Sequence, residues 1–318
     1  MVYLRQLILP SERAEIEVIK NEGRTCFNSF YPFKIFTEKR LFNIDFEGIT
    51  MLYGGNGSGK STLINVLAKK LGAVRYSDFN SAPFFDKFTN MCSVEYGRTP
   101  ENSYVLTSDD VFDYVLNART VNIDIDEKRN ELIDNYYAVH KEAQSNPDIL
   151  RLGGLDDYER WKTTVEILSR KKTQSSYVNK RIARDIDLKS NGETAMRYFL
   201  ERIDEDALYL LDEPENSLSI AYQIELAEYI SATARATRSQ FIIATHSPVL
   251  LSMPNARIYN LDAYPATVSK WTDLPNVRKY FDFFMEHREE FEPGSRVLVY
   301  LSGRGDKDMD IIEQALGQ

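Results

Sequence analysis

The sequence contains little cysteine and no long apolar segment. Only Cys26 and Cys92 occur among 318 residues, which is too few for a disulfide scaffold and is typical of a reducing compartment. No apolar run reaches the ~20 residues that span a bilayer. The N-terminus also lacks the long apolar core and cleavage site of a secretory signal. These absences predict a cytoplasmic protein that does not insert directly into a membrane.

The chain also has few histidines and carries no net positive charge. The chain has three histidines and no His/Cys cluster, which disfavours a zinc site. It has 39 basic and 48 acidic residues, a net charge of −9, which excludes a uniformly basic nucleic-acid coat but not a local basic patch. Residues 159–189 hold nine basic and four acidic side chains. The stretch Arg160–Lys189 is therefore either a solvated helical face or a surface for a nucleic-acid backbone or an acidic partner.

The hydrophobic pattern predicts strands that alternate with helices. Residues 1–53 read as short strands, including 15–20, 30–36 and 41–46, and the apolar run 49–53 predicts a buried strand. From Lys60 the apolar residues share one helical face until Gly72. In the middle region we expect separate helices over 109–119, 126–144 and 156–170.

The C-terminal half repeats this alternation. A helical stripe covers 195–203, and buried strands are expected at 207–211 and 241–244, with a helix over 219–235 between them. A helix follows over 273–290. Such alternation predicts an α/β fold whose parallel sheet is covered on both sides.

A glycine-rich segment joins the strand 49–53 to the helix that begins at Lys60. It reads Gly54-Gly55-Asn56-Gly57-Ser58-Gly59-Lys60-Ser61 and matches G-x-x-x-x-G-K-[ST]. Backbone N–H groups of such a loop surround a polyphosphate, the lysine reaches the β- and γ-phosphates, and the serine ligates Mg²⁺. Thr62 follows within the same predicted nucleotide-binding segment. The alternative is a glycine-rich strand–helix turn without a ligand.

Polar residues follow the next two buried strands. Asp212 and Glu213 end the strand 207–211, and His246 follows the strand 241–244. Since ligands bind at the carboxyl ends of parallel strands, Asp212 is suited to hold Mg²⁺, Glu213 to polarise a water, and His246 to contact a γ-phosphate. The alternatives are an ordinary polar strand end and a structural histidine.

Together these segments resemble the ATP-binding-cassette ATPase superfamily. The similarity is to its soluble branch of chromosome-maintenance, recombination and phage-defence ATPases, and to small bacterial AAA-family ATPases. Gly54–Ser61 resembles Walker A, Leu208–Glu213 Walker B, Glu215–Ser219 the D-loop, and Lys189–Glu193 a shortened signature motif. The signature precedes Walker B by 22 residues, and Glu213 precedes the switch histidine His246 by 33.

The resemblance implies a P-loop NTPase of the ABC type with a mixed sheet. An N-terminal β-rich lobe would cover 1–75, a helical lid insert 76–188, a C-terminal lobe 189–270, and a tail 271–318. ATP and Mg²⁺ would be the cofactors. ATP would be sandwiched in a homodimer, with Ser190 and Gly192 of one protomer facing the γ-phosphate held by the other; the alternative is that Ser190 only caps a helix.

The implied function is ATP hydrolysis, with Glu213, His246 and Lys60 in the catalytic site. The partners would be a separate effector protein and, through the basic stretch, nucleic acid, as in nucleic-acid processing or phage defence. The alternatives are a nucleotide-gated binding module that does not hydrolyse ATP and the ATPase subunit of a transporter. The signature lacks the Gly-Gly-Gln of transporter subunits, which disfavours the last.

Several features depart from the family pattern. Gln144 and Gln174 fit the Q-loop poorly, and the 128 residues between Ser61 and Ser190 are too few for long coiled-coil arms. An aromatic residue within 30–36 is expected to stack on adenine. The tail at 297–308 resembles the C-terminal segment of the tryptophan synthase β chain, which implies a strand–turn–helix addition without that enzyme's other parts.

Overall fold

The computed structural model describes residues 2–22, 29–77, 79, 82–145, 158–168, 173, 178, 191–203 and 206–290. The chain divides into two compact units. The first comprises Met1–Asp113 and Ser190–Gln318, and the second comprises Tyr114–Lys189. The tail over 297–308 and most of the basic stretch Arg160–Lys189 lie outside the described residues.

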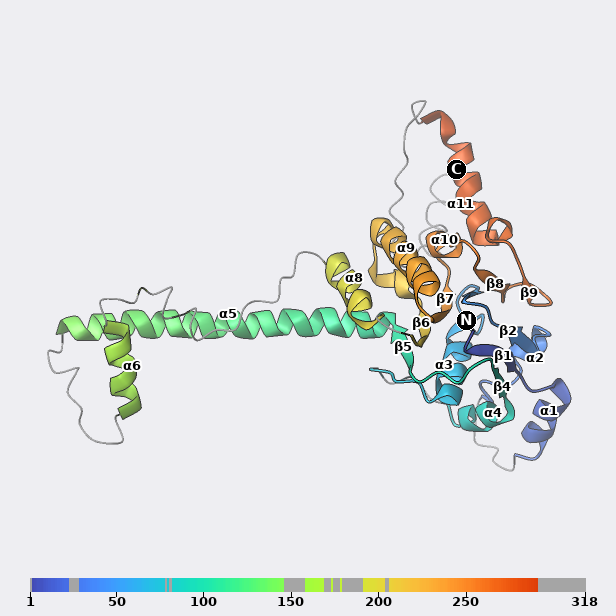
Figure 1. The fold of residues 1–318 in the computed structure, drawn as a ribbon, viewed down its shortest axis with the longest axis horizontal. Helices are drawn as coiled ribbons and strands as arrows, with labels where there is room; N and C mark the ends of the chain where they lie inside the picture. The colour runs from blue at the N-terminus through green and yellow to red at the C-terminus, as the bar shows by residue number, and fades with distance from the viewer. Residues whose placement is uncertain are drawn as a thin grey trace. The chain divides into compact units, whose positions relative to one another are not determined.

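A six-stranded mixed sheet forms the centre of the first unit (Figure 1). The strand order is β5-β6-β7-β3-β8-β9, in which the first five strands are parallel and β9 is antiparallel to β8. The strands are β3 (Ile49–Tyr53), β5 (Ser103–Thr107), β6 (Leu208–Asp212), β7 (Gln240–Thr245), β8 (Arg257–Asn260) and β9 (Thr267–Val268). Because β6, β7 and β3 are neighbours, their carboxyl ends meet at one edge of the sheet.

Helices pack on both faces of this sheet. The helix α3 (Lys60–Leu71) contacts β5, β6 and β7, while α9 (Ile220–Ala236) contacts β7, and the two lie on opposite sides of the strands in Figure 1. The predicted apolar face of α3 is buried, as Leu63, Val66 and Leu67 show. The helix α8 (Asn191–Arg202) packs against α9.

The remaining elements of the first unit are mostly short. They are α2 (Ile35–Glu38), α4 (Phe85–Met91), the 3-10 turn η2 (Pro214–Ser217), α10 (Pro248–Leu251), η3 (Trp271–Asp273), α11 (Pro275–Glu286) and η4 (Arg288–Glu290).

A small antiparallel sheet is joined to the large one by a buried glutamine. It has the order β2-β1-β4, formed by Asn43–Asp45, Leu4–Ile8 and Ser93–Tyr96. The side chain of Gln240 in β7 accepts hydrogen bonds from the N–H groups of Tyr3 and Leu4 at 3.0 and 2.8 Å and donates to the Leu4 carbonyl at 2.9 Å. One side chain therefore satisfies backbone groups at the start of β1.

The N-terminal region corrects two expectations. Residues 15–20 belong to the helix α1 (Glu12–Lys20) rather than to a strand, and Ser11 caps its first turn. Residues 30–36 form turns that lead into α2, because their aromatic rings fill the core: Phe33 and Phe36 pack on Phe88 at centroid distances of 5.5 and 5.9 Å. The strand expected within 41–46 is confirmed as β2.

The middle region also differs from expectation. A single helix, α5 (Ser108–Ser145), replaces the two helices expected over 109–119 and 126–144. Residues 76–113 belong to the first unit because β4 pairs with β1 and β5 with β6. The second unit therefore begins well after the boundary expected at 76.

The second unit contains the rest of α5 and α6 (Tyr158–Leu168). A small apolar cluster lies within it, where buried Ile167 and Val178 pack with partly buried residues of α5 such as Ile133 and Tyr136. Among the described residues no helix is both long and apolar enough to cross a membrane.

Candidate functional site

The glycine-rich loop joins β3 to α3 at the sheet's carboxyl edge, as the sequence predicts. Gly59 has φ +100°, and a Cβ atom there would lie 2.9 Å from the Phe36 ring, so this position requires glycine. The loop ends at the N-terminus of α3, where unpaired N–H groups favour an anion. Its backbone geometry suits a polyphosphate.

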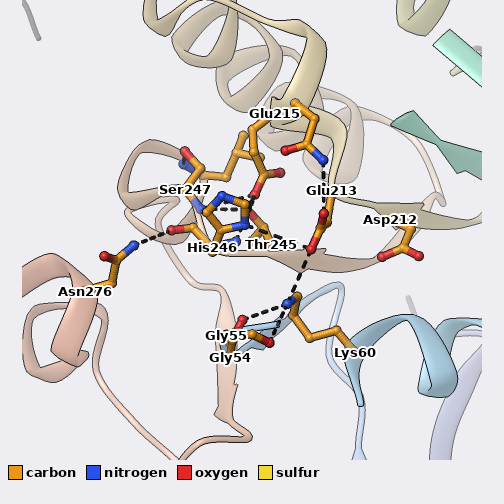
Figure 2. A network of polar contacts seen from close by, with 12 residues as sticks. Gly54, Gly55, Lys60, Asp212, Glu213, Glu215, Thr245, His246, Ser247 and Asn276 are labelled. Atoms are coloured by element: carbon orange, nitrogen blue, oxygen red, sulfur yellow. Dashed lines mark hydrogen bonds and ion pairs between the residues drawn. The ribbon is translucent and has the colours of Figure 1, made fainter. Parts of the chain in front are cut away.

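Lys60 lies inside the loop rather than in solvent. Its side chain is only 4% exposed, and its ammonium donates to the carbonyls of Gly54 at 2.7 Å and Gly55 at 3.1 Å. The same Nζ lies 3.4 Å from Glu213 Oε1. The ammonium is thus held at the point where the loop faces the acidic end of β6 (Figure 2).

Ser61 and Asp212 come together across the sheet edge. The Ser61 hydroxyl donates to Asp212 Oδ1 at 3.1 Å. Burial raises the pKa of Asp212 to about 7, the nearby Glu213 carboxylate adds to this increase, and the Ser61 hydrogen bond opposes it. A hydroxyl and a carboxylate are the oxygen ligands that Mg²⁺ prefers, so this pair could hold the ion.

Glu213 is fixed in a conformation that few side chains adopt. Its φ and ψ are 49° and 52°, in the left-handed region that is uncommon for a residue with a side chain. Its N–H donates to the Ala244 carbonyl at 2.9 Å, and Asn216 Nδ2 donates to its Oε2 at 3.0 Å. These contacts aim the carboxylate at Lys60 and His246.

His246 follows β7 and faces two carboxylates (Figure 2). Its Nδ1 lies 3.3 Å from Glu215 Oε1 and 4.0 Å from Glu213 Oε1. The ring is 23% exposed. The structure therefore brings together Lys60, Glu213 and His246, three residues that lie far apart in the sequence.

Three contributors were not predicted. Glu215 accepts a hydrogen bond from the His246 N–H after β7 at 2.8 Å, and Asn276 of α11 donates to the His246 carbonyl at 3.2 Å. Asp262 accepts from the Gly55 N–H at 2.8 Å. Asp262 and Asn276 also line an open pocket beside the loop with Tyr53, Asn56 and His246. Glu215 falls inside the D-loop-like segment, but the other two carry no sequence signal because they belong to no motif.

Among the aromatic residues at 30–36, Tyr31 is the one whose polar atom reaches the α3 helix. Its hydroxyl lies 2.7 Å from Thr62 Oγ1. Phe33 and Phe36 are buried in the core, and Phe30 packs on Phe84 at 5.0 Å between centroids. Adenine stacking by one of these aromatic residues remains a prediction.

The signature-like segment is described only in part. Gly192 lies in the first turn of α8, as expected, whereas Ser190 lies outside the described residues. A Cβ atom on Gly192 would lie 2.9 Å from the Tyr222 ring of α9. Close helix packing is therefore a sufficient structural reason for this glycine, and its contact with a partner's nucleotide stays a prediction.

Two family models match the chain. The model described as "AAA domain, putative AbiEii toxin, Type IV TA system" matches residues 102–252. The model described as "P-loop containing region of AAA domain" matches residues 31–84. The two matches include the glycine-rich loop, the acidic end of β6 and His246. No curated protein matches this sequence.

Solved structures with a similar course of the chain include an Smc head domain and an ATP-binding cassette. One is an Smc head domain with an extended coiled coil, bound to the C-terminal domain of ScpA, from Pyrococcus furiosus; the identity is 14%, the match covers 91% of this chain and 100% of that one, and the TM-score is 0.39. The other is a nucleotide-free ATP-binding cassette from an ABC transporter, with 14% identity, 89% and 96% coverage and a TM-score of 0.37.

Proposed function

Because the chain contains a P-loop domain of the AAA family, we propose that it binds and hydrolyses ATP as an ABC-type ATPase. The family matches confirm the predicted resemblance, and the parallel-dominated sheet with its loop after β3 confirms the predicted P-loop α/β fold class. Hydrolysis, dimerisation and the roles of single residues belong to the proposal.

The observation that carries the proposal is that two pairs of side chains meet at one edge of the sheet. Lys60 meets Glu213 at 3.4 Å, and Ser61 meets Asp212 at 3.1 Å. A cation, a magnesium-type oxygen pair and a carboxylate for the attacking water thus surround the phosphate loop. These are the parts that phosphoryl transfer to water requires.

Each residue has a separate task in this scheme. On nucleotide binding Lys60 exchanges its contacts with the Gly54 and Gly55 carbonyls for the β- and γ-phosphates. Ser61 and Asp212 would hold Mg²⁺, which would supply positive charge beside the phosphates. Glu213 orients a water for in-line attack, and His246 contacts the γ-phosphate.

We propose further that two chains enclose ATP between them. The start of α8, with Ser190 and Gly192, would then face the γ-phosphate of the opposite protomer, where a helix N-terminus stabilises negative charge. The description of the larger matching family, a type IV toxin–antitoxin system, is compatible with an ATPase that acts with a separate effector in phage defence. Nucleic-acid processing in the cytoplasm is the related possibility.

The substitution Glu213→Gln tests hydrolysis and dimerisation together. The amide keeps the shape of the side chain but cannot polarise water, so MgATP is expected to accumulate uncleaved and hold two protomers together. Phosphate release should fall by at least ~100-fold, while light scattering detects an ATP-dependent dimer. Glu228→Gln, at an exposed position of α9, is the matched control and should hydrolyse ATP like the wild type.

Three outcomes would contradict the proposal or one of its parts. A Glu213→Gln chain that stays monomeric and retains turnover would reject the role of Glu213 in hydrolysis and the dimer held by ATP. Background phosphate release by the wild type with saturating MgATP would favour a nucleotide-gated binding module. Co-purification with a transmembrane partner would instead favour a transporter ATPase subunit.

A further inference from the structure

Glu215 is a buried carboxylate that does not touch the phosphate loop. It lies in η2, three residues after Asp212, and is 2% exposed. Three donors converge on its Oε1: the Thr245 hydroxyl at 2.7 Å, the His246 N–H at 2.8 Å and the Ser247 N–H at 3.2 Å. One carboxylate oxygen thus holds three consecutive residues where the chain leaves β7.

The segment around His246 is also held from its other sides. The Ser247 hydroxyl donates to Gln223 Oε1 of α9 at 2.6 Å, and Asn276 Nδ2 of α11 donates to the His246 carbonyl at 3.2 Å. The backbone of His246 is therefore fixed between η2, α9 and α11. These contacts fix the point from which the imidazole ring extends.

The ring itself faces the same carboxylate. Nδ1 of His246 lies 3.3 Å from Glu215 Oε1, and a carboxylate oxygen can only accept hydrogen bonds. Within the described residues His246 is the one potential cation that pairs with Glu215, and the next carboxylate oxygen, Glu213 Oε1, lies farther from Nδ1 at 4.0 Å. A proton on Nδ1 suits this arrangement and leaves Nε2 for another partner.

We propose that Glu215 is a positioning residue, which fixes the backbone and the Nδ1–H form of His246 so that Nε2 is presented to the terminal phosphate of the nucleotide. This inference rests on the proposed function for the identity of the ligand. With the proton on Nδ1, a neutral ring offers a lone pair at Nε2 and a protonated ring offers a second N–H.

The first test reads the tautomer in the wild-type chain without nucleotide. Because the sequence contains only three histidines, ¹⁵N–¹H correlation spectra of the imidazole rings can be assigned with His140→Gln and His287→Gln variants. Under conditions where the His246 ring is neutral, the proton is expected on Nδ1. A proton found mainly on Nε2 would overturn the inference, whatever the outcome for ATP hydrolysis.

The second test substitutes Glu215→Gln, which keeps the size of the side chain and an acceptor oxygen but removes its charge. The amide can also donate to Nδ1, so the population of the Nδ1–H form is expected to fall. In the same variant kcat for ATP should drop roughly 10- to 100-fold, while the affinity for MgATP changes by less than about 3-fold because Glu215 does not touch the loop. Glu225→Gln, exposed on α9, is the matched control.

The outcomes separate this inference from the proposed function. A Glu215→Gln chain with an unchanged tautomer and unchanged kcat would overturn the inference. A wild-type chain that shows the Nδ1–H form but binds no ATP would reject the proposed function and leave the contact between Glu215 and His246 established. If Glu215→Gln does not fold, the wild-type spectrum still decides.

Discussion

Among single residues, Asp212 is a carboxyl group at a site that disfavours its charge. Burial at the end of β6 raises its pKa to about 7, and the adjacent Glu213 carboxylate acts in the same direction. Without a cation, part of the Asp212 population is therefore protonated near neutral pH. A bound Mg²⁺ would supply the missing positive charge.

This setting predicts how stability depends on pH when metal and nucleotide are absent. The pKa of Asp212 in the folded chain, about 7, lies above the ~3.9 of an unfolded chain. Between these values the folded state holds a proton that the unfolded state has released, so the free energy of unfolding falls as pH rises from ~4 to about 7.

The substitution Asp212→Asn removes this titration. We expect the variant to gain about 2–3 kcal/mol relative to the wild type as the pH rises from 5 to 8, measured by urea denaturation in EDTA. The same variant should bind nucleotide with little response to Mg²⁺. If the free energy of unfolding depends on pH in the same way in both proteins, the pKa of Asp212 is not raised in the folded state.

At the scale of elements, the junction of β5 and α5 places the start of a long helix at the sheet edge that carries the candidate site. Thr107 ends β5 opposite Asp212 in the register of the sheet. Its hydroxyl accepts from the Asp110 N–H at 3.1 Å, and Asp110 Oδ2 accepts from the Thr107 N–H at 2.8 Å. This reciprocal pair is a capping box, and it fixes where α5 begins.

Removal of the cap should therefore destabilise the first unit. Asp110 is 4% exposed, so Asp110→Ala leaves a Thr107 N–H without its acceptor and should cost about 1–2 kcal/mol of unfolding free energy. The matched control is Asp109→Ala, which removes the same charge from the exposed neighbouring position. Equal losses in the two variants would mean that charge at the helix start, rather than the capping contact, is responsible.

For the whole molecule, the uneven distribution of charge along the chain is the basis for predicting a nucleic-acid partner. The chain carries a net charge of −9, yet residues 159–189 hold nine basic and four acidic side chains. Because the whole chain is negatively charged, it repels a nucleic acid, and binding would require the positive charge of residues 159–189. Binding through this stretch would release counterions and so depend steeply on salt.

Neutralisation of Arg170, Lys171 and Lys172 tests this dependence. Substitution of all three by glutamine should weaken binding to duplex DNA and lower the slope of log affinity against log salt by up to about 3, as measured by fluorescence anisotropy. Arg13, Lys20 and Lys270, exposed cations of the first unit, provide the control triple. Binding that is independent of salt, or equal in both triples, would exclude the basic stretch as a nucleic-acid surface.

Local sequence patterns predicted some helices and strands correctly and others wrongly. The strand β3, the helix α3 and the stop at Gly72 are confirmed because apolar spacing and glycine act over a few residues. Residues 15–20 alternate in polarity but form a helix that Ser11 caps, and Glu15 in its first turn is buried and accepts from the Lys34 N–H and the Thr37 hydroxyl. Such a distant polar contact leaves no trace in the hydrophobic pattern.

The residues alone were sufficient to predict the phosphate loop, the acidic strand end and the candidate histidine, because each is a short segment whose residue types follow from local chemistry. That these segments meet is a result of the fold. The strand order β6-β7-β3 places Asp212, His246 and the loop at one edge, and only folding brings Glu215, Asp262 and Asn276 to them. Contacts between residues that are distant in the chain depend on strand order and packing, which no local motif encodes.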